Sequence, residues 1–224
     1  MSPVRLLLAT RNAKKLVELR RILASSAITG VQVIGLDHVP PFPEAPETAA
    51  TFEENALAKA RDAAAATGLP AVADDSGLEV DALNGMPGVL SARWAGRHGD
   101  DAANLQLVLD QLADIPEGRR GAAFVCAAAL VVPSGTQIFQ TVVRGHWRGT
   151  LSCAARGSHG FGYDPIFVPE GGQRTSAELD PAEKDVASHR GQALRALLPA
   201  VRQLLDAQRD FSSRPGRPRP PTAG

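Results

Sequence analysis

Hydrophobic and polar positions follow two different periods at the start of the chain. Val4–Ala9 is a short apolar run typical of a buried strand, and a polar turn follows at Thr10-Arg11-Asn12. Apolar residues then recur three and four positions apart, which predicts an amphipathic helix ending near Ala24. These residues are Leu16, Leu19, Ile22 and Leu23.

Similar patterns and the turn-forming residues predict the elements that follow. We expect strands at Val31–Leu36 and Ala71–Ala73, a proline-rich loop at His38–Pro46, a turn at Gly85–Gly88, a helix at about Asp101–Leu112, and a hairpin of Gly121–Val132 with Gln137–Trp147 around Pro133-Ser134-Gly135. Thr51-Phe52-Glu53-Glu54 forms a capping box that begins a helix, and Gly68-Leu69-Pro70 ends this helix after Thr67. Strands and helices alternate before the hairpin, so the class is α/β with a mixed sheet.

The last helix begins at Asp180-Pro181, where Asp caps and Pro takes the first helical position. We expect it to reach about Arg209 and to be bent or divided at Pro199. Gly191 inside it would cost about 1 kcal/mol relative to Ala, which suggests that another group approaches closely. Residues 1–209 therefore form one domain, and 210–224 form an Arg/Pro-rich tail that we expect to be disordered.

Composition excludes several classes of protein. The 24 Lys and Arg balance 24 Asp and Glu, which argues against binding nucleic acid through overall positive charge. The longest apolar stretches, such as Ala122–Val132, are too short for a membrane-spanning helix, and the N-terminus does not resemble a signal peptide. Two cysteines, Cys126 and Cys153, form neither a disulfide framework nor a zinc site, which favours a reducing cytoplasm.

The turn between the first strand and the first helix is a candidate phosphate site. Backbone N–H groups and the positive end of the helix dipole gather at such a helix start. Lys14 and Lys15 oppose that dipole unless an anion lies nearby, and they are two of only four lysines in the chain. The alternative is a capped helix with two exposed lysines.

Asp74-Asp75-Ser76-Gly77 follows a buried strand and offers ligands for a cation. Mg²⁺ takes one or two protein carboxylates and completes its shell with water and phosphate oxygens. Only one of the two carboxylates needs to face a site while the chain stays extended. The alternative is an Asp-Ser-Gly turn closed by a local side-chain bond. Asn55 and Lys59 lie four apart on one helix face, and Glu47 precedes that helix in irregular chain.

Two later segments could bind a nucleobase. Phe161-Gly162-Tyr163-Asp164 places two aromatic rings in a glycine-rich segment, where they could stack on a base or fill the core. Lys184 opens the last helix, and Arg190 can donate two parallel hydrogen bonds to a purine 6-oxo group and N7.

The order of these motifs resembles the inosine triphosphate pyrophosphatase family, which acts on dITP, XTP and other non-canonical purine nucleotides. The motifs are Thr-x-Asn-x-x-Lys, Glu-Thr-x-x-Thr-Phe-x-Glu-Asn-Ala-x-x-Lys-Ala, Ala-Asp-Asp-Ser-Gly-Leu with Pro-Gly-Val-x-Ser-Ala-Arg, Phe-Gly-Tyr-Asp-Pro-x-Phe, and Glu-Lys-x-x-x-Ser-His-Arg-Gly-x-Ala. The likeness covers about residues 4 to 205. It implies an elongated α/β fold with two lobes around a nucleotide groove, usually in a homodimer. It also implies Mg²⁺-dependent cleavage of ITP, dITP or XTP to the monophosphate and pyrophosphate, which cleanses the nucleotide pool.

The resemblance also assigns roles to residues. It implies that Asp75 is the general base for the attacking water and that Glu47 and Asp75 bind the metal. The residues that it places against the substrate are Thr10, Arg11, Asn12, Ala13, Lys14, Lys15, Lys59, Ser76, Phe161, Gly162, Tyr163, Asp164, Lys184, Ser188, His189 and Arg190. The chain departs from the family at His159, where a small residue is common, and in the tail beyond Asp210.

Two alternative functions remain open on the sequence. One is another Mg²⁺-dependent nucleotide phosphohydrolase, which would release orthophosphate or act on a pyrimidine triphosphate. The other is a non-catalytic nucleotide- or RNA-binding protein that uses the basic tail, although we expect no specific nucleic-acid partner and no membrane association.

Overall fold

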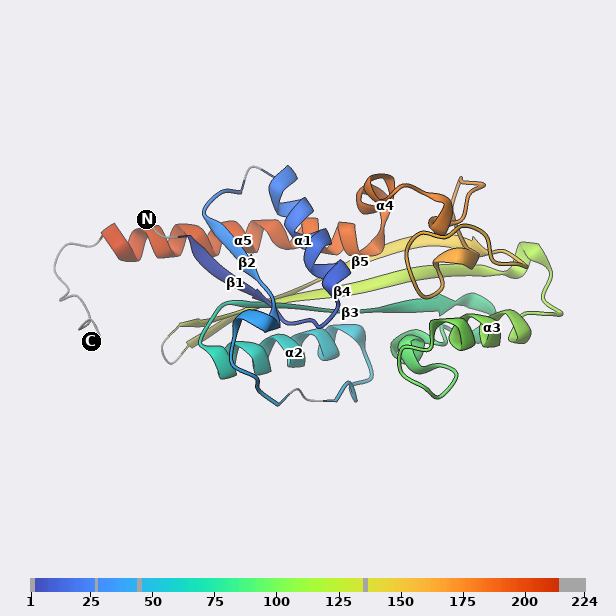
Figure 1. Cartoon of the computed structure of the whole chain (residues 1–224), viewed down its shortest axis with the longest axis horizontal. Coiled ribbons are helices and arrows are strands. Elements are labelled where there is room, and N and C mark those ends of the chain that lie inside the picture. The colour runs from blue at the N-terminus through green and yellow to red at the C-terminus, as the bar shows by residue number, and fades with distance from the viewer. Residues whose placement is uncertain (1–2, 27, 44–45, 135–136, 214–224) are drawn as a thin grey trace.

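The computed structural model describes residues 3–26, 28–43, 46–134 and 137–213, and a six-stranded sheet forms its centre (Figure 1). The strands are β1 (Val4–Leu8), β2 (Val31–Ile34), β3 (Ala71–Val80), β4 (Gly121–Ser134), β5 (Gln137–Leu151) and β6 (Phe167–Pro169). The helices are α1 (Ala13–Ser25), α2 (Phe52–Thr67), α3 (Asp101–Gln111), α4 (Pro181–Ala187) and α5 (His189–Ser213). The sheet order is β2-β1-β3-β4-β5-β6. Parallel and antiparallel pairs occur together, so the predicted α/β class with a mixed sheet is confirmed.

Strand β3 is longer than the sequence predicted. It pairs in parallel with β1 only at Ala71 and Val72, after which β1 ends and its chain turns toward α1. The antiparallel partner β4 supports β3 as far as Val80, so the predicted end at Ala73 was wrong. The segment 74–77 is therefore extended strand and not a turn. Beyond Val72, β4 is the only described strand that forms a ladder with β3.

Helices cover both faces of this part of the sheet. Figure 1 shows α1 and α5 over one face and α2 over the other. Because side chains alternate along a strand, Leu6, Leu8 and Val72 pack toward α1 and α5, whereas Leu7, Ala71 and Ala73 pack toward α2. The same alternation assigns Asp74 to the α1/α5 face and Asp75 to the α2 face.

A third core cluster lies at the other end of the long strands. It joins Leu78 and Val80 of β3 with Val108 of α3 and Phe167 of β6. The strands β3, β4 and β5 run through both halves, which gives the molecule its elongated form in Figure 1. The fold thus has two lobes that share one sheet. In the described part of the chain, no helix is long and apolar enough to cross a bilayer.

The N-cap predicted at Thr51 for α2 is confirmed, but the predicted capping box is formed only in part, because the Glu54 side chain bonds the Thr51 hydroxyl and not the Thr51 backbone N–H. The Thr51 hydroxyl accepts a hydrogen bond from the Glu54 backbone N–H at 3.2 Å and donates one to the Glu54 carboxylate at 3.0 Å. Gly68 ends the helix in the left-handed region, at φ 67°. The bonds to Thr51 explain why Glu54 stands at this position. Asn55 and Lys59 are then the polar residues of α2 that face the edge of the sheet.

The last helix is divided at Ser188 and not at Pro199, so the predicted division at Pro199 was wrong, and a bend there stays a prediction. Ser188 is extended (φ −64°, ψ 153°), and its hydroxyl accepts from the Gly191 N–H at 3.1 Å, which caps α5. Pro199 lies inside α5, and this helix continues through Ser213. Residues 214–224, most of the predicted tail, lie outside the described part of the chain.

Close packing against α4 explains the glycine at position 191 and predicts that replacing it lowers the stability of the protein. A Cβ atom there would overlap the backbone carbonyl oxygen of Asp185 in α4. We expect Gly191→Ala to lower the free energy of unfolding by about 1–3 kcal/mol, although Ala is the better helix former. Urea unfolding measures this change. Gly118→Ala is the matched control, because a Cβ at that exposed glycine meets nothing within 4 Å. Equal stability of the two variants would contradict the close approach.

Candidate functional site

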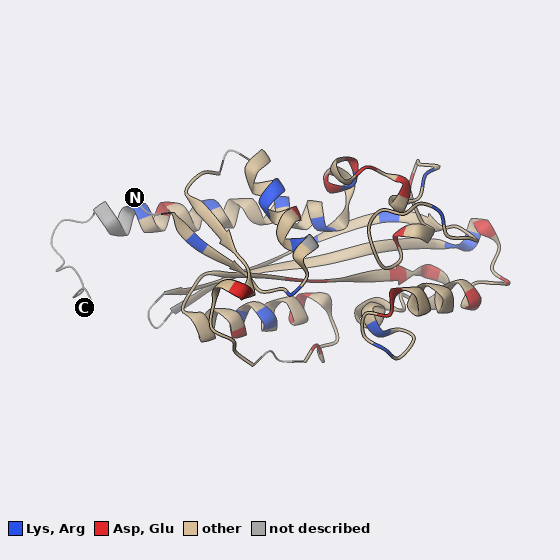
Figure 2. Ribbon diagram, in the orientation of Figure 1, with Lys and Arg blue, Asp and Glu red and all other residues tan. Residues whose placement is uncertain are grey.

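A groove of about 560 Å³ opens where β3 loses β1 as its neighbour. It brings together eight of the predicted site residues from the first half of the chain, and Phe161 and Arg190 reach it from the second half. The eight are Thr10, Arg11, Asn12, Lys15, Glu47, Lys59, Asp75 and Ser76. Figure 2 shows that acidic and basic residues are interspersed over both halves of the molecule.

Asp75 is held on the α2 side of the groove. The Asn55 amide donates to its carboxylate at 2.9 Å, and the Lys59 ammonium lies 3.6 Å from its other oxygen. Lys59 also donates to Glu47 at 2.7 Å, so one lysine serves two carboxylates. Asn55 is itself oriented, because its side-chain oxygen accepts from the Ala49 N–H at 3.0 Å.

The pKa values of the two carboxylates that share Lys59 are shifted in opposite directions. Burial raises the pKa of Asp75 above its ordinary value, and the negative charge of Glu47 adds to this effect against the opposing charge of Lys59. Burial also acts on Glu47, but the charge and hydrogen bond of Lys59 outweigh it and hold the pKa of Glu47 below its ordinary value. Glu47 is therefore the better fixed anion and Asp75 the better proton acceptor.

Asp74 gathers cations on the opposite face of the same strand. Its carboxylate accepts from Lys15 at 2.8 Å and from the Nε of Arg190 at 3.3 Å. Burial alone would raise the pKa of Asp74, but the charges of these two residues hold it well below its ordinary value. Asp74 is thus a permanently ionised partner. It also accounts for Lys15 at the start of α1, where the helix dipole alone would disfavour a cation.

The donor set of the groove fits Mg²⁺. Glu47 and Asp75 supply hard carboxylate oxygens on the two sides of Lys59. Within residues 3–26, 28–43, 46–134 and 137–213, no group of three or more His, Cys, Asp or Glu side chains converges as a metal site. Such a pair suits an ion that takes one or two protein carboxylates and fills its other positions with water and phosphate oxygens.

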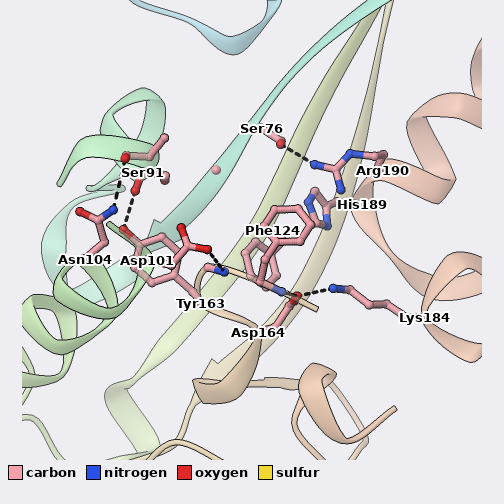
Figure 3. Close-up of a pocket in the computed structure, with 14 residues that line it drawn as sticks. Ser76, Ser91, Asp101, Asn104, Phe124, Tyr163, Asp164, Lys184, His189 and Arg190 are labelled. Carbon is pink, nitrogen blue, oxygen red and sulfur yellow. Dashed lines mark hydrogen bonds and ion pairs between the residues drawn. The ribbon is translucent and has the colours of Figure 1, made fainter. Parts of the chain in front are cut away.

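A pocket of about 100 Å³ continues from the groove into the second lobe (Figure 3). Its predicted site residues are Ser76, Phe161, Gly162, Tyr163, Asp164, Lys184, His189 and Arg190. The Phe161 ring lies at the junction, since it lines both the pocket and the groove. The Lys184 ammonium and the Arg190 guanidinium lie 5.7 and 5.6 Å from the centre of this ring. Their N–H groups are thus available beside an aromatic face on which a flat base could stack.

Tyr163 and Asp164 shape this pocket from within the protein. The Tyr163 hydroxyl donates to the Ser91 carbonyl at 2.8 Å, and its ring belongs to the core of the second lobe. Asp164 accepts from the Phe161 N–H at 2.8 Å and from the Ser176 hydroxyl at 2.7 Å, and it also pairs with Lys184. Of the two interpretations for the aromatic pair, core filling therefore applies to Tyr163, whereas stacking on a base stays a prediction for Phe161, which lines both the groove and the pocket.

His189 is a buried, neutral part of the pocket wall. Its ring stacks on Phe124 with centroids 4.8 Å apart, and its Nδ1 has no hydrogen-bond partner among the described residues. Burial, reinforced by the nearby charges of Arg190 and Lys184, holds the pKa of His189 well below its ordinary value near 6.5. The ring therefore presents a neutral nitrogen at this wall, which Figure 3 shows beside Phe124 and Arg190.

Three positions stand apart from the groove. Ala13 and His159 line a neighbouring recess of about 350 Å³. Ser188 is buried, and its hydroxyl caps α5. Lys14 lies in the first turn of α1, and its side chain lies outside the described part of the structure.

Among the residues that the sequence prediction did not assign, two lie beside Glu47. Arg93 donates to the Glu47 carbonyl at 2.9 Å and so steadies the loop that carries that carboxylate. Its position in the Pro-Gly-Val-x-Ser-Ala-Arg motif was an available signal. His98 lines the groove on the Glu47 side and helps to lower the pKa of Glu47. No pattern in the sequence distinguished His98 from an ordinary loop residue.

Comparison with known proteins gives consistent results along nearly the whole chain. A family model described as the Ham1 family matches residues 6–200. A protein of Nocardia farcinica named dITP/XTP pyrophosphatase is 68% identical over 206 residues, which are 92% of this chain and 98% of that protein. A crystal structure of a nucleoside-triphosphatase, dITP/XTP pyrophosphatase, from Mycobacterium abscessus superposes with a TM-score of 0.72 at 61% identity, covering 88% of this chain and 100% of that one. A HAM1 protein of Coxiella burnetii gives a TM-score of 0.78 at 42% identity, covering 89% and 99%.

The neutral state of His189 predicts an acid-sensitive stability. Because its pKa is depressed in the folded state, the stability is fully present above about pH 6.5 and is lost as the pH falls, when only the unfolded chain takes up a proton. The free energy of unfolding should fall by up to about 1.4 kcal/mol per pH unit from this group. Urea unfolding between about pH 7.5 and 5.5 measures the slope. His189→Phe keeps a stacked ring and should remove this contribution; an unchanged slope would contradict the buried neutral imidazole.

Proposed function

Because the chain belongs to the Ham1 family, we propose that its groove is the site where this enzyme hydrolyses non-canonical purine nucleoside triphosphates. The substrates are those with a 6-oxo group, dITP, ITP and XTP, and the products are the monophosphate and pyrophosphate. The reaction breaks a phosphoric anhydride bond and removes such nucleotides from the pool.

One observation carries this proposal more than any other. A single continuous groove and pocket place a carboxylate pair with two lysines at one end and an aromatic ring flanked by two cations at the other. Phe161 lines both spaces and marks the join between them. This arrangement suits a ligand with a charged chain at one end and a flat, acceptor-rich base at the other.

At the charged end, Lys15 and Lys59 attract the triphosphate. Asp75 accepts a proton from a water molecule as the water oxygen forms a bond to phosphorus, and the bond between the α- and β-phosphates breaks. Pyrophosphate departs with the bridging oxygen or with the new one, according to which phosphorus is attacked. The raised pKa of Asp75 suits this role, because a carboxylate with higher proton affinity is the stronger base.

Mg²⁺ completes the charged end of the proposed site. Glu47 and Asp75 would hold it, and the bound ion would neutralise charge that develops on the phosphate oxygens. Lys59 lies within ion-pair distance of both carboxylates, and its charge acts to lower the pKa of each. Asn55 fixes the rotation of Asp75 at the same time.

At the base end, the proposed contacts select a purine by its acceptors. Arg190 and Lys184 offer only N–H donors beside the Phe161 ring. A 6-oxo group accepts from such donors, whereas the 6-amino group of adenine would point a donor at a donor. The site therefore discriminates through an unfavourable contact with adenine as well as a favourable one with hypoxanthine or xanthine.

Assembly and location complete the proposal. The family resemblance supports a homodimer that works in the cytoplasm. The groove lies between two lobes of one chain and is large enough for a nucleotide. The proposed reaction therefore requires neither a membrane nor a nucleic acid.

Replacing the base tests the charged end. Asp75→Asn keeps the shape of the side chain but removes its proton affinity, so kcat on dITP should fall by about 10²- to 10⁴-fold. Pyrophosphate release measures turnover, and thermal unfolding checks the fold. Asp81→Asn is the matched control, because that carboxylate is exposed and pairs with Arg148 on the surface. A turnover near that of the wild type in Asp75→Asn would exclude Asp75 as the base.

Replacing Arg190 tests the base end. The ratio of kcat/KM for dITP to that for dATP should fall by about tenfold or more in Arg190→Ala, whereas exposed Arg202→Ala on the same helix should leave it unchanged. The same assay, run on a panel of triphosphates with and without Mg²⁺, tests the reaction itself. Release of orthophosphate instead of pyrophosphate, or equal rates without Mg²⁺, would contradict the proposed function.

A further inference from the structure

Arg190 is the most fully engaged cation of the site. Its Nε donates to Asp74 at 3.3 Å, its Nη1 to Glu18 at 3.2 Å and its Nη2 to the Ser76 hydroxyl at 2.9 Å. Only 4% of its side chain is exposed. Three bonds from three directions fix the plane of the guanidinium group, and each terminal nitrogen keeps a second N–H beyond the one used here.

Asp74 joins this arginine to the phosphate end of the groove. The same carboxylate oxygen, Oδ2, lies 2.8 Å from Lys15 and 3.3 Å from Arg190. Its side chain is 3% exposed, so water does little to screen these charges. Without the carboxylate, the partly buried Lys15 and the buried Arg190 would repel each other across one residue of β3, and Lys15 would lose the partner that holds it here.

Asp74 can bind both cations because of the face of β3 on which it lies, and Asp75 lies on the other face. Asp74 points to the α1/α5 face, where the helices that carry Lys15 and Arg190 pack together, whereas Asp75 points to α2. Glu18 lies one helical turn from Lys15 on α1 and contacts Arg190 alone of this pair. Among the described residues, one carboxylate is therefore bound to both cations and a second one only to the arginine.

We propose that Asp74 is a positioning residue that fixes Lys15 and Arg190 in one rigid arrangement, so that binding of the triphosphate and discrimination of the base depend on the same carboxylate. This inference rests on the proposed function, which assigns phosphate binding to Lys15 and base recognition to Arg190. Asp74 itself touches neither the phosphates nor the base. Asp74 acts on the ligand only through the two cations that it holds in position.

Two readouts separate the ends of the site. The inhibition constant of inorganic tripolyphosphate against dITP, measured with Mg²⁺, reports on the phosphate end. The ratio of kcat/KM for dITP to that for dATP reports on the base end. In Asp74→Asn we expect the inhibition constant to rise and the ratio to fall, each by about tenfold. A merely structural role would lower activity without moving both quantities.

Two matched variants give the contrast. Glu18→Gln should lower the base ratio and leave tripolyphosphate inhibition unchanged, whereas Lys15→Gln should do the reverse. Thermal unfolding checks each variant, and Asp74→Glu, which moves the charge by one methylene, replaces Asp74→Asn if the latter does not fold. Both readouts should change in either Asp74 variant; a change in only one, or in neither, would overturn the proposal. Failure of the wild type to cleave dITP would instead contradict the proposed function.

Discussion

The site depends on the loss of one strand partner. β1 ends after pairing with Val72, while β4 keeps the next residues of β3 extended. The free edge that results is where the groove opens, and it follows the rule that ligands bind beyond the carboxyl ends of parallel strands. Because the strand stays extended there, two consecutive carboxylates reach opposite faces. Asp74 meets the helices that carry Lys15 and Arg190, and Asp75 meets the helix that carries Lys59.

Charge pairing explains how a chain of zero net charge is suited to a polyanion. In the described structure, four cations of the groove and pocket are already paired with carboxylates: Lys15 with Asp74, Lys59 with Glu47 and Asp75, Lys184 with Asp164, and Arg190 with Asp74 and Glu18. Pairing holds these side chains in position before a substrate arrives, which reduces the entropy lost on binding. The suitability of the site for a polyanion therefore depends on where a few cations lie and not on the overall charge of the chain.

Local patterns predicted most of the fold and brought most of the site residues to attention. The N-cap of α2, the amphipathic α1 and the β4–β5 hairpin all arise from nearby residues, and the structure has them. The length of β3 depends on a distant partner, β4, which no local pattern encodes. The break at Ser188 is local, since Ser188 caps α5 and Gly191 packs against Asp185, but the prediction placed the break at Pro199 instead. The residues alone offered two adjacent carboxylates, and the resemblance assigned a role to Asp75 but none to Asp74.

A crystal structure with a non-hydrolysable dITP analogue and Mg²⁺ tests the central claim most directly. The account predicts phosphate oxygens within hydrogen-bond distance of Lys15 and Lys59, the metal on Glu47 and Asp75, and the purine stacked on Phe161 with its 6-oxo group facing N–H donors. Asp74 should still bridge Lys15 and Arg190 without touching the ligand. Phosphates bound away from the free edge of β3, or a base bound away from Phe161, would contradict it.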